Sequence, residues 1–381
     1  MWLLAAILQS ILRTDVTRTA LLSQPSGATP RRLRIGCCAE VADPDWRWVA
    51  NNLGPPLADW TFFSTRNRGF LEKLITRPAL SRYRACHELA RGAVSGEFDL
   101  IVTHLPLVTC WTETFCGRRR KCPHVAFAFN FTELPTGPRL VLMRRAFQRL
   151  DRVIVFSSFE RTLYSDYFGI PATRIDVIPW RIQDPRVQRL RSRHDPAATA
   201  GAIPTGNSET ISAVGSQGRD YATLFEAMRR LPLIKLVLVA GAKNLQGLDP
   251  PSNVEVRQNI PLAEAEAVLR ESRFVVVPLR DAQTACGHVT IVYSMFEERA
   301  VVATDSAALA EYVIPGRNGV LVKPRDAAAL TQAIGDLWGK PEEARRLGAA
   351  GREIALANCL ESQTVDYFRR LIEQVGSTGS L

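Results

Sequence analysis

The sequence has no apolar run long enough to span a bilayer. The apolar start MWLLAAILQSIL, Met1–Leu12, covers about a dozen residues, whereas a transmembrane helix needs about 20. No basic residue precedes this run, as a secretory signal would require. An interfacial helix and a misassigned start codon both remain open for it. We expect residues 1–30 to form an N-terminal extension that packs poorly on the core.

The sequence also lacks a recognisable metal site. It holds eight cysteines, and the nearest approach to a cluster is formed by Cys110, Cys116, Cys122 and His124. The gaps of five residues between these cysteines do not match the spacing of zinc ligands. We therefore expect a cytoplasmic protein with reduced thiols and no bound metal.

Acidic residues are scarce in the first half of the chain. Residues 1–200 hold 29 Lys and Arg against 17 Asp and Glu, whereas residues 201–381 hold 19 against 21. This asymmetry indicates different partners for the two halves, or simply an arginine-rich surface. The basic residues are scattered, few aromatic residues lie among them, and no nucleic-acid-binding motif is present. Nucleic-acid binding is therefore disfavoured.

Strand-like and helix-like segments alternate along the chain. Amphipathic stretches such as Arg139–Leu150 separate short apolar segments at Leu33–Cys37, Trp60–Ser64, Phe98–His104, His124–Asn130, Arg152–Ser157 and Arg174–Trp180. Periodicity fails over residues 183–207, which are rich in proline and glycine and are predicted to be a linker. A second alternation follows, with helices predicted at Leu262–Glu271 and Ala327–Trp338 among others. The pattern predicts an α/β fold with two doubly wound parallel-sheet domains that face across a ligand cleft.

A turn in the second half has the pattern of a phosphate site. The apolar run RFVVVPL, Arg273–Leu279, is typical of a strand buried on both faces. After a polar loop, Val289, Val292, Tyr293 and Phe296 follow the period of a helix. In a parallel strand–loop–helix unit, the helix N-terminus lies where ligands bind, and its free N–H groups suit an anion. We expect a phosphate-bearing ligand at residues 287–290, where a glycine allows close backbone approach.

Several motifs in the expected order resemble the retaining family-4 glycosyltransferases of the GT-B fold. In the second half they are VGSQGRDYATLFEA (214–227), LVLVAG, VVVPL, the Gly-x-x-Thr turn and AVVATDSAALAEYVIPGRNGVLVKPRDAAALTQAI (300–334). The first half adds RLDRVIVFSSFERTLY and IPATRIDVIPW, and FNFTELP (129–135) is similar to a bacterial subgroup. The resemblance implies two Rossmann-like domains. Residues 31–182 would bind the acceptor, joined by a returning helix at 360–375, and residues 208–359 would bind the donor.

The resemblance also implies a donor site. Arg219 stands where the family usually has a lysine that contacts the donor pyrophosphate, and Gly215 would permit close approach nearby. The turn that receives the phosphates and the sugar matches Cys286, Gly287, His288, Val289 and Thr290. Two glutamates that many relatives carry are replaced by Ala285 and Tyr293. Tyr293 could hydrogen-bond the ribose in place of a glutamate, or it could pack in the core.

The expected function is sugar transfer from a nucleotide sugar to a lipid-linked saccharide, a polysaccharide or a small molecule. The resemblance implies retention at the anomeric carbon with no cofactor and no metal. Convincingly placed paired carboxylates are lacking, which agrees with front-face substitution. Asn130 and His104 are the candidates for the chemistry and Thr132 for the acceptor side, although each could instead be a local loop cap. A catalytically silent relative that binds a nucleotide or a protein remains the alternative.

The basic segment RRRK, residues 118–121, suggests a place for the acceptor. It lies near Trp111 and Phe115, and the helix Arg139–Leu150 adds further arginines. Such residues attract anionic headgroups, and apolar neighbours can insert at the interface. We expect a peripheral protein at the inner face of a membrane. The competing interpretation is that these arginines are solvated and their apolar neighbours belong to the core.

Overall fold

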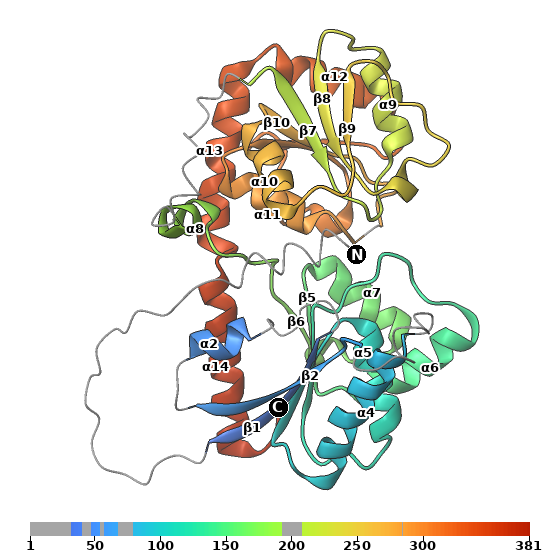
Figure 1. Cartoon of the computed structure of the whole chain (residues 1–381), viewed down its shortest axis with the longest axis vertical. Coiled ribbons are helices and arrows are strands. Elements are labelled where there is room, and N and C mark those ends of the chain that lie inside the picture. The colour runs from blue at the N-terminus through green and yellow to red at the C-terminus, as the bar shows by residue number, and fades with distance from the viewer. Residues whose placement is uncertain (1–31, 40–46, 54–56, 68–78, 193–207, 284) are drawn as a thin grey trace.

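Two six-stranded parallel sheets form two α/β domains (Figure 1). The computed structural model describes residues 32–39, 47–53, 57–67, 79–192, 208–283 and 285–381. The strand orders are β2-β1-β3-β4-β5-β6 and β12-β11-β10-β7-β8-β9. In both sheets the order reverses beside the first strand of the domain, which is the doubly wound arrangement. The predicted fold class is confirmed.

In the first domain the central strands are buried because helices cover both faces of the sheet, whereas the edge strand β2 is partly exposed. The strands are β1 (Leu33–Ala39), β2 (Ala58–Ser64), β3 (Leu100–His104), β4 (His124–Phe127), β5 (Arg152–Val155) and β6 (Ile175–Val177). The helices are α2 (Trp48–Leu53), α4 (Leu80–Ser95), α5 (Pro106–Cys116), α6 (Gly137–Phe147) and α7 (Ser158–Phe168). Beneath α6 and α7, an aromatic cluster packs edge to face around Phe129.

The second domain repeats this plan. Its strands are β7 (Thr210–Val214), β8 (Lys235–Val239), β9 (Val254–Arg257), β10 (Phe274–Val277), β11 (Ala300–Thr304) and β12 (Gly319–Val322). Its helices are α9 (Tyr221–Arg229), α10 (Leu262–Glu271), α11 (His288–Phe296), α12 (Ala327–Trp338) and α13 (Pro341–Asn358). The sequence did not predict β9. This strand forms the edge of the sheet, and its sequence VEVR carries two charges.

Part of the predicted linker is a helix. α8 (Pro185–Ser192) starts at a proline, which is favourable in the first helical turn because no intrahelical N–H is needed there. Arg186 and Arg189 of α8 pair with Glu298 and Glu297 at 2.8 and 2.5 Å. Residues 185–192 of the predicted linker therefore form a helix that the sequence analysis did not predict. Residues 193–207 and the predicted extension at 1–30 lie outside the described residues.

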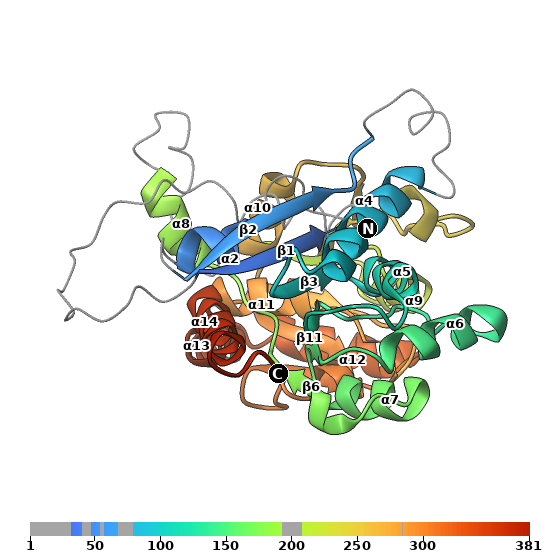
Figure 2. The same cartoon turned by 90° about the horizontal axis from the view of Figure 1, so that it is seen from below.

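The last helix, α14 (Glu361–Thr378), lies against the first domain. α13 runs beside the second domain and α14 follows it along the same side of the molecule (Figures 1 and 2). The Phe368 ring lies 5.5 Å from that of Phe127, and the Tyr367 hydroxyl lies 2.6 Å from Asp176 Oδ2. The chain thus crosses between the domains twice. Among the described residues, no helix combines the length and apolarity needed to cross a membrane.

The two domains contact each other beside the cleft. The buried hydroxyl of Tyr312, from the second domain, accepts a hydrogen bond from Trp180 N at 2.8 Å and donates one to Phe156 O at 2.7 Å. The backbone N–H of Ser158, in the first turn of α7, donates to the Glu311 carboxylate at 2.9 Å. These contacts fix how the carboxyl edges of the two sheets face each other.

Candidate active site

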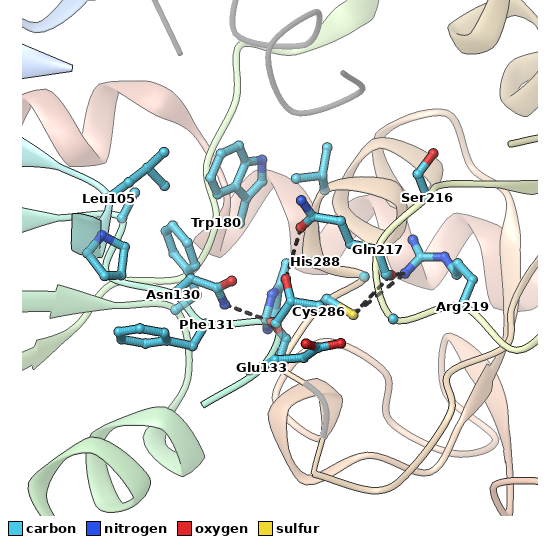
Figure 3. A pocket seen from close by; sticks show the side chains of 18 of the residues that line it. Leu105, Asn130, Phe131, Glu133, Trp180, Ser216, Gln217, Arg219, Cys286 and His288 are labelled. Atoms are coloured by element: carbon cyan, nitrogen blue, oxygen red, sulfur yellow. Dashed lines mark hydrogen bonds between the residues drawn. The ribbon is translucent and has the colours of Figure 1, made fainter. Parts of the chain in front are cut away.

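A cavity of about 600 Å³ lies between the domains, within the usual range for small-molecule sites. Its walls come from the carboxyl ends of both sheets, where α/β proteins bind ligands. In Figure 3, Leu105, Asn130 and Trp180 lie on one side, and Ser216 and Arg219 lie on the other. The lining is therefore shared between the two domains.

The N-terminus of α11 forms part of the second-domain wall, through residues 286–289. Gly287 caps this helix with φ of 101° and no side-chain hydrogen bond. A Cβ at Gly287 would lie 3.2 Å from Val277 Cγ1, so both conformation and space favour glycine. The N–H groups of the first turn have no partner within the helix. Together with the helix dipole, they form a site suited to an anion.

Arg219 is fixed beside this helix terminus. Its guanidinium donates to Gln217 O at 3.0 Å and to Thr290 Oγ1 at 3.2 Å. Gly215 makes room for it, because a Cβ there would lie 2.5 Å from Arg219 Nη2. Arg219 and Cys286 line the cavity, whereas Gly215 and Thr290 lie behind it and position Arg219. Gly215 thus permits the close approach of the Arg219 side chain.

His288 is a buried, neutral residue in the cavity wall. Its side chain lies between the rings of Phe156 and Tyr312, with centroids at 5.9 and 4.9 Å. Nε2 lies 3.1 Å from Ala308 O, so Nε2 carries the proton and donates to that carbonyl. Burial lowers the pKa of His288 to about 4. His288 therefore shapes the cavity wall as an imidazole held in one tautomer, and it carries no positive charge near neutral pH.

Asn130 reaches across the cleft from the first domain. Its Nδ2 donates to Ala285 O at 2.7 Å and to Glu160 Oε1 at 2.8 Å. Burial raises the pKa of Glu160 to about 7. Thr132 makes a second contact across the cleft, from its Oγ1 to Gln217 Oε1 at 3.2 Å. Asn130 and Thr132 both line the cavity, so the structure brings these two predicted residues against the second-domain wall.

Both domains match glycosyltransferase family models. The model for glycosyltransferase family 4 matches residues 49–182, and the model for glycosyl transferases group 1 matches residues 210–340. The chain is therefore similar, domain by domain, to glycosyltransferases of the GT-B fold. The first match covers most of the domain that carries Asn130, and the second covers the α11 turn and Arg219.

Curated relatives of the chain include two mannosyltransferases. One is the GDP-mannose-dependent alpha-(1-6)-phosphatidylinositol monomannoside mannosyltransferase of Mycolicibacterium smegmatis, 28% identical over 57% of this chain and 60% of the relative. The other is the MMP alpha-(1->4)-mannosyltransferase of Mycolicibacterium hassiacum, 24% identical over 74% of this chain and 67% of the relative. The alignment thus spans less than two thirds of the first of these relatives.

Solved structures of other proteins share the fold. A sucrose-phosphate synthase from Thermosynechococcus elongatus aligns with a TM-score of 0.67 at 20% identity, over 91% of this chain and all of that one. Anabaena HepE in complex with UDP-glucose aligns with a TM-score of 0.62 at 16% identity, again over 91% of this chain and all of that one. At these identities the likeness shows the fold alone.

Besides Gly215 and Thr290, two more residues predicted for the site lie outside the cavity lining. His104 is buried at the end of β3, with its ring 5.7 Å from that of Phe127, and burial lowers its pKa to about 3. The next residue, Leu105, lines the cavity instead. Tyr293 is buried behind the turn and faces Glu266, whose pKa burial raises to about 7. Tyr293 therefore packs in the core, which is the second of the two roles that the sequence allowed for it.

The basic segment at residues 118–121 is split between surface and interior. Arg120 pairs with Glu113 at 2.8 Å and with Asp151 at 2.7 Å, whereas its three basic neighbours are exposed. Trp111 and Phe115 pack against α4, which partly buries both rings. Arg120 therefore holds α5 to the sheet, and only the other three basic residues remain available to a partner.

The cysteine-rich segment, residues 110–124, brings no set of metal ligands together among the described residues. The His124 imidazole is already bonded on both sides, to Glu113 Oε1 at 2.6 Å and to Thr103 Oγ1 at 2.7 Å. The eight cysteines all lie among the described residues, where they form no disulfide and are buried in the hydrophobic clusters. Within the part of the chain that the structure describes, no three His, Cys, Asp or Glu side chains gather as a metal site.

Several lining residues were missed by the sequence analysis. They include Arg82, Leu105, Arg139, Trp180, Asn244 and Arg280. Most follow the carboxyl end of a strand or begin the next helix. The rule that ligands bind at this edge would have singled out these segments, but not which side chain of each points inward.

Proposed function

We propose that this glycosyltransferase moves a sugar from a nucleotide-sugar donor on the second domain to an acceptor on the first. The observation that carries the proposal is the arrangement of the cavity. One wall presents the N-terminus of α11 with Arg219, and the facing wall presents Asn130 and Thr132. A diphosphate on the first wall would direct its sugar toward the second wall.

The donor half supplies stabilisation of the leaving group. As the sugar–phosphate bond breaks, negative charge grows on the diphosphate. The Arg219 guanidinium and the free N–H groups of α11 are already aimed at that region, so little reorganisation is needed. One relative is named for GDP-mannose, and HepE was solved with UDP-glucose, so both nucleotides are candidates.

We propose substitution on the front face of the sugar, with retention and without a metal. Among the described lining residues, the one carboxylate is Glu133, which is 79% exposed and lies 3.4 Å from Arg280. Its exposure makes it poorly suited to act as a buried nucleophile. In the proposed step the acceptor oxygen bonds to the anomeric carbon, the bond to the diphosphate breaks, and the acceptor proton passes to the leaving phosphate oxygen.

A catalytically silent relative is the second candidate. The observation that favours it is the pair Ala285 and Tyr293, which stand where the resemblance expects glutamates. Ala285 is buried, its carbonyl accepts from Asn130, and Tyr293 lies behind the cavity wall. Such a protein would bind a nucleotide without turning over a nucleotide sugar.

Turnover separates the two candidates. Wild-type protein is incubated with UDP-glucose or GDP-mannose and a panel of saccharide acceptors, and release of the nucleoside diphosphate is measured. Arg219→Ala, prepared in the same way, controls for contaminating activity. Release by the wild type that the variant lacks supports the enzyme. Nucleotide binding without release over the whole panel supports the silent relative, and absence of both contradicts both candidates.

We also propose that the acceptor domain binds an anionic membrane surface. Arg118, Arg119 and Lys121 are exposed on the acceptor domain, where anionic headgroups would attract them. Under this proposal the protein acts in the cytoplasm, at the inner face of the membrane.

A further inference from the structure

The acceptor half of the cavity is electropositive. Three helices of the first domain begin at this edge, and α5 packs between α4 and α6 (Figure 2). Arg82 is in the first turn of α4, Pro106 and Leu107 begin α5, and Arg139 is in the first turn of α6. All four residues line the cavity. The positive ends of three helix dipoles thus coincide with two arginine side chains.

These three helix ends lack the usual compensation. None of α4, α5 and α6 has an acidic residue in its first turn or a side-chain hydrogen bond from its N-cap. By contrast, α7, α9 and α12 are capped by Ser157, Asp220 and Asp326. Among the described residues, the first turns of α4, α5 and α6 thus donate no hydrogen bond to their own N-cap side chains.

Arg139 is a cation without a counter-ion. It is exposed, it lines the cavity, and it has no hydrogen-bond or ion-pair partner among the described residues. Other arginines of this region have structural roles. Arg144 donates to Tyr167 O at 2.7 Å, and Arg149 pairs with Glu113 at 3.1 Å. Glu133, the one carboxylate of the described lining, is already paired with Arg280.

We propose that the acceptor carries a phosphate group, which binds to Arg139 and Arg82 at the N-termini of α5 and α6. This site is distinct from the donor diphosphate site at Arg219, because the two lie on opposite domains. A guanidinium presents paired donors that match two phosphate oxygens, and free backbone N–H groups can take the others. The inference rests on the proposed function, since it names the class of acceptor that function would use.

The test is a titration of protein that is first saturated with UDP or GDP, so that the donor phosphate site is filled. Inorganic phosphate, glucose 6-phosphate, glucose and glucuronate are the probes, and calorimetry gives their affinities. The variants are Arg139→Gln and Arg82→Gln. Arg145→Gln is the matched control, because Arg145 is an exposed residue of the same helix that does not line the cavity.

The proposal expects glucose 6-phosphate to bind the saturated protein and glucose not to bind. Arg139→Gln should weaken glucose 6-phosphate by about 10-fold or more, because it removes a charge-assisted contact. Arg145→Gln should have no effect. The proposal is overturned if neither phosphate probe binds, if Arg139→Gln and Arg82→Gln leave affinity unchanged, or if glucuronate binds as tightly as glucose 6-phosphate.

Failure of the proposed function gives a different result. In that case UDP and GDP do not bind, and the phosphate probes are titrated into the free protein instead. Binding that Arg139→Gln weakens would still support an anion site on the first domain. Binding that only Arg219→Ala weakens would place the phosphate at the donor site and overturn the proposal.

Discussion

Replacing Gly287 by alanine should damage the donor site more than it damages the fold. The backbone at Gly287 has φ of 101°, and its Cβ would press on Val277 at 3.2 Å. Gly316 offers a matched control. It has φ of 73°, nothing within 4 Å of where its Cβ would lie, and no place in the cavity lining.

Both substitutions hold a non-glycine residue at positive φ, which costs about 1–3 kcal/mol of unfolding free energy. Only Gly287→Ala moves the first N–H groups of α11. Losing one hydrogen bond to a charged phosphate costs about 1.5–3 kcal/mol, or about 10- to 150-fold in affinity. Gly287→Val should be at least as damaging, because its β-branched side chain needs more room.

The assay pairs urea denaturation with calorimetric titration of UDP and GDP on both alanine variants. We expect similar losses of stability and a loss of nucleotide affinity confined to Gly287→Ala. If the two variants bind nucleotide equally well, the α11 terminus does not hold the phosphates and the reasoning fails.

Three further effects follow from buried or exposed groups. Replacing Tyr312 by phenylalanine leaves a buried N–H and a buried carbonyl without partners, so urea denaturation should show a loss of about 1–3 kcal/mol. His288 has a pKa of about 4 in the folded protein, below its ordinary value of about 6.5. The free energy of unfolding should therefore fall as pH drops from about 6.5 to about 4, because only the unfolded chain takes up the proton. His288→Gln should reduce the slope of that fall by up to about 1.4 kcal/mol per pH unit. Neutralising Arg118, Arg119 and Lys121 should weaken co-sedimentation with anionic vesicles at low salt.

Each of these effects has a contradicting result. Unchanged stability of the phenylalanine variant would show that the hydroxyl contacts between the domains carry little energy. Identical pH profiles for wild type and His288→Gln would show that this imidazole is not held neutral. Absence of vesicle binding by the wild type at low salt would remove the membrane proposal. Arg120 is kept in the vesicle variant, because its ion pairs with Glu113 and Asp151 are structural.

Local sequence signals predicted much of the second domain. The predicted helices Leu262–Glu271 and Ala327–Trp338 match α10 and α12 to the residue. Their apolar period is clear, and Asp326 caps the start of α12. The sequence missed β9 because an edge strand does not need a continuous apolar run. It missed α8 because ion pairs with Glu297 and Glu298, rather than an apolar pattern, hold that helix in place.

Residue spacing predicted the part of the candidate site that one segment builds, whereas Arg219 came from the family resemblance and Asn130 and Thr132 from their places at a strand end. The turn around Gly287 combines a glycine, a helix start and a preceding strand, so residue spacing alone predicted a candidate phosphate site there. Arg82 and Arg139 reach the cavity from separate helices, and only the packing of α4, α5 and α6 brings them to one edge. His104 was misplaced by a single position, because consecutive residues at a strand end point in different directions.

Calorimetric titration of UDP and GDP into wild type, Arg219→Ala and Arg317→Ala tests the central claim most directly. Arg317 is an exposed arginine of the same domain, outside the cavity lining. We expect one of the two nucleotides to bind the wild type and Arg317→Ala equally, and to bind Arg219→Ala about 10- to 150-fold more weakly. Equal binding to all three proteins, or no binding of either nucleotide to the wild type, would contradict a donor diphosphate site at Arg219 and the start of α11.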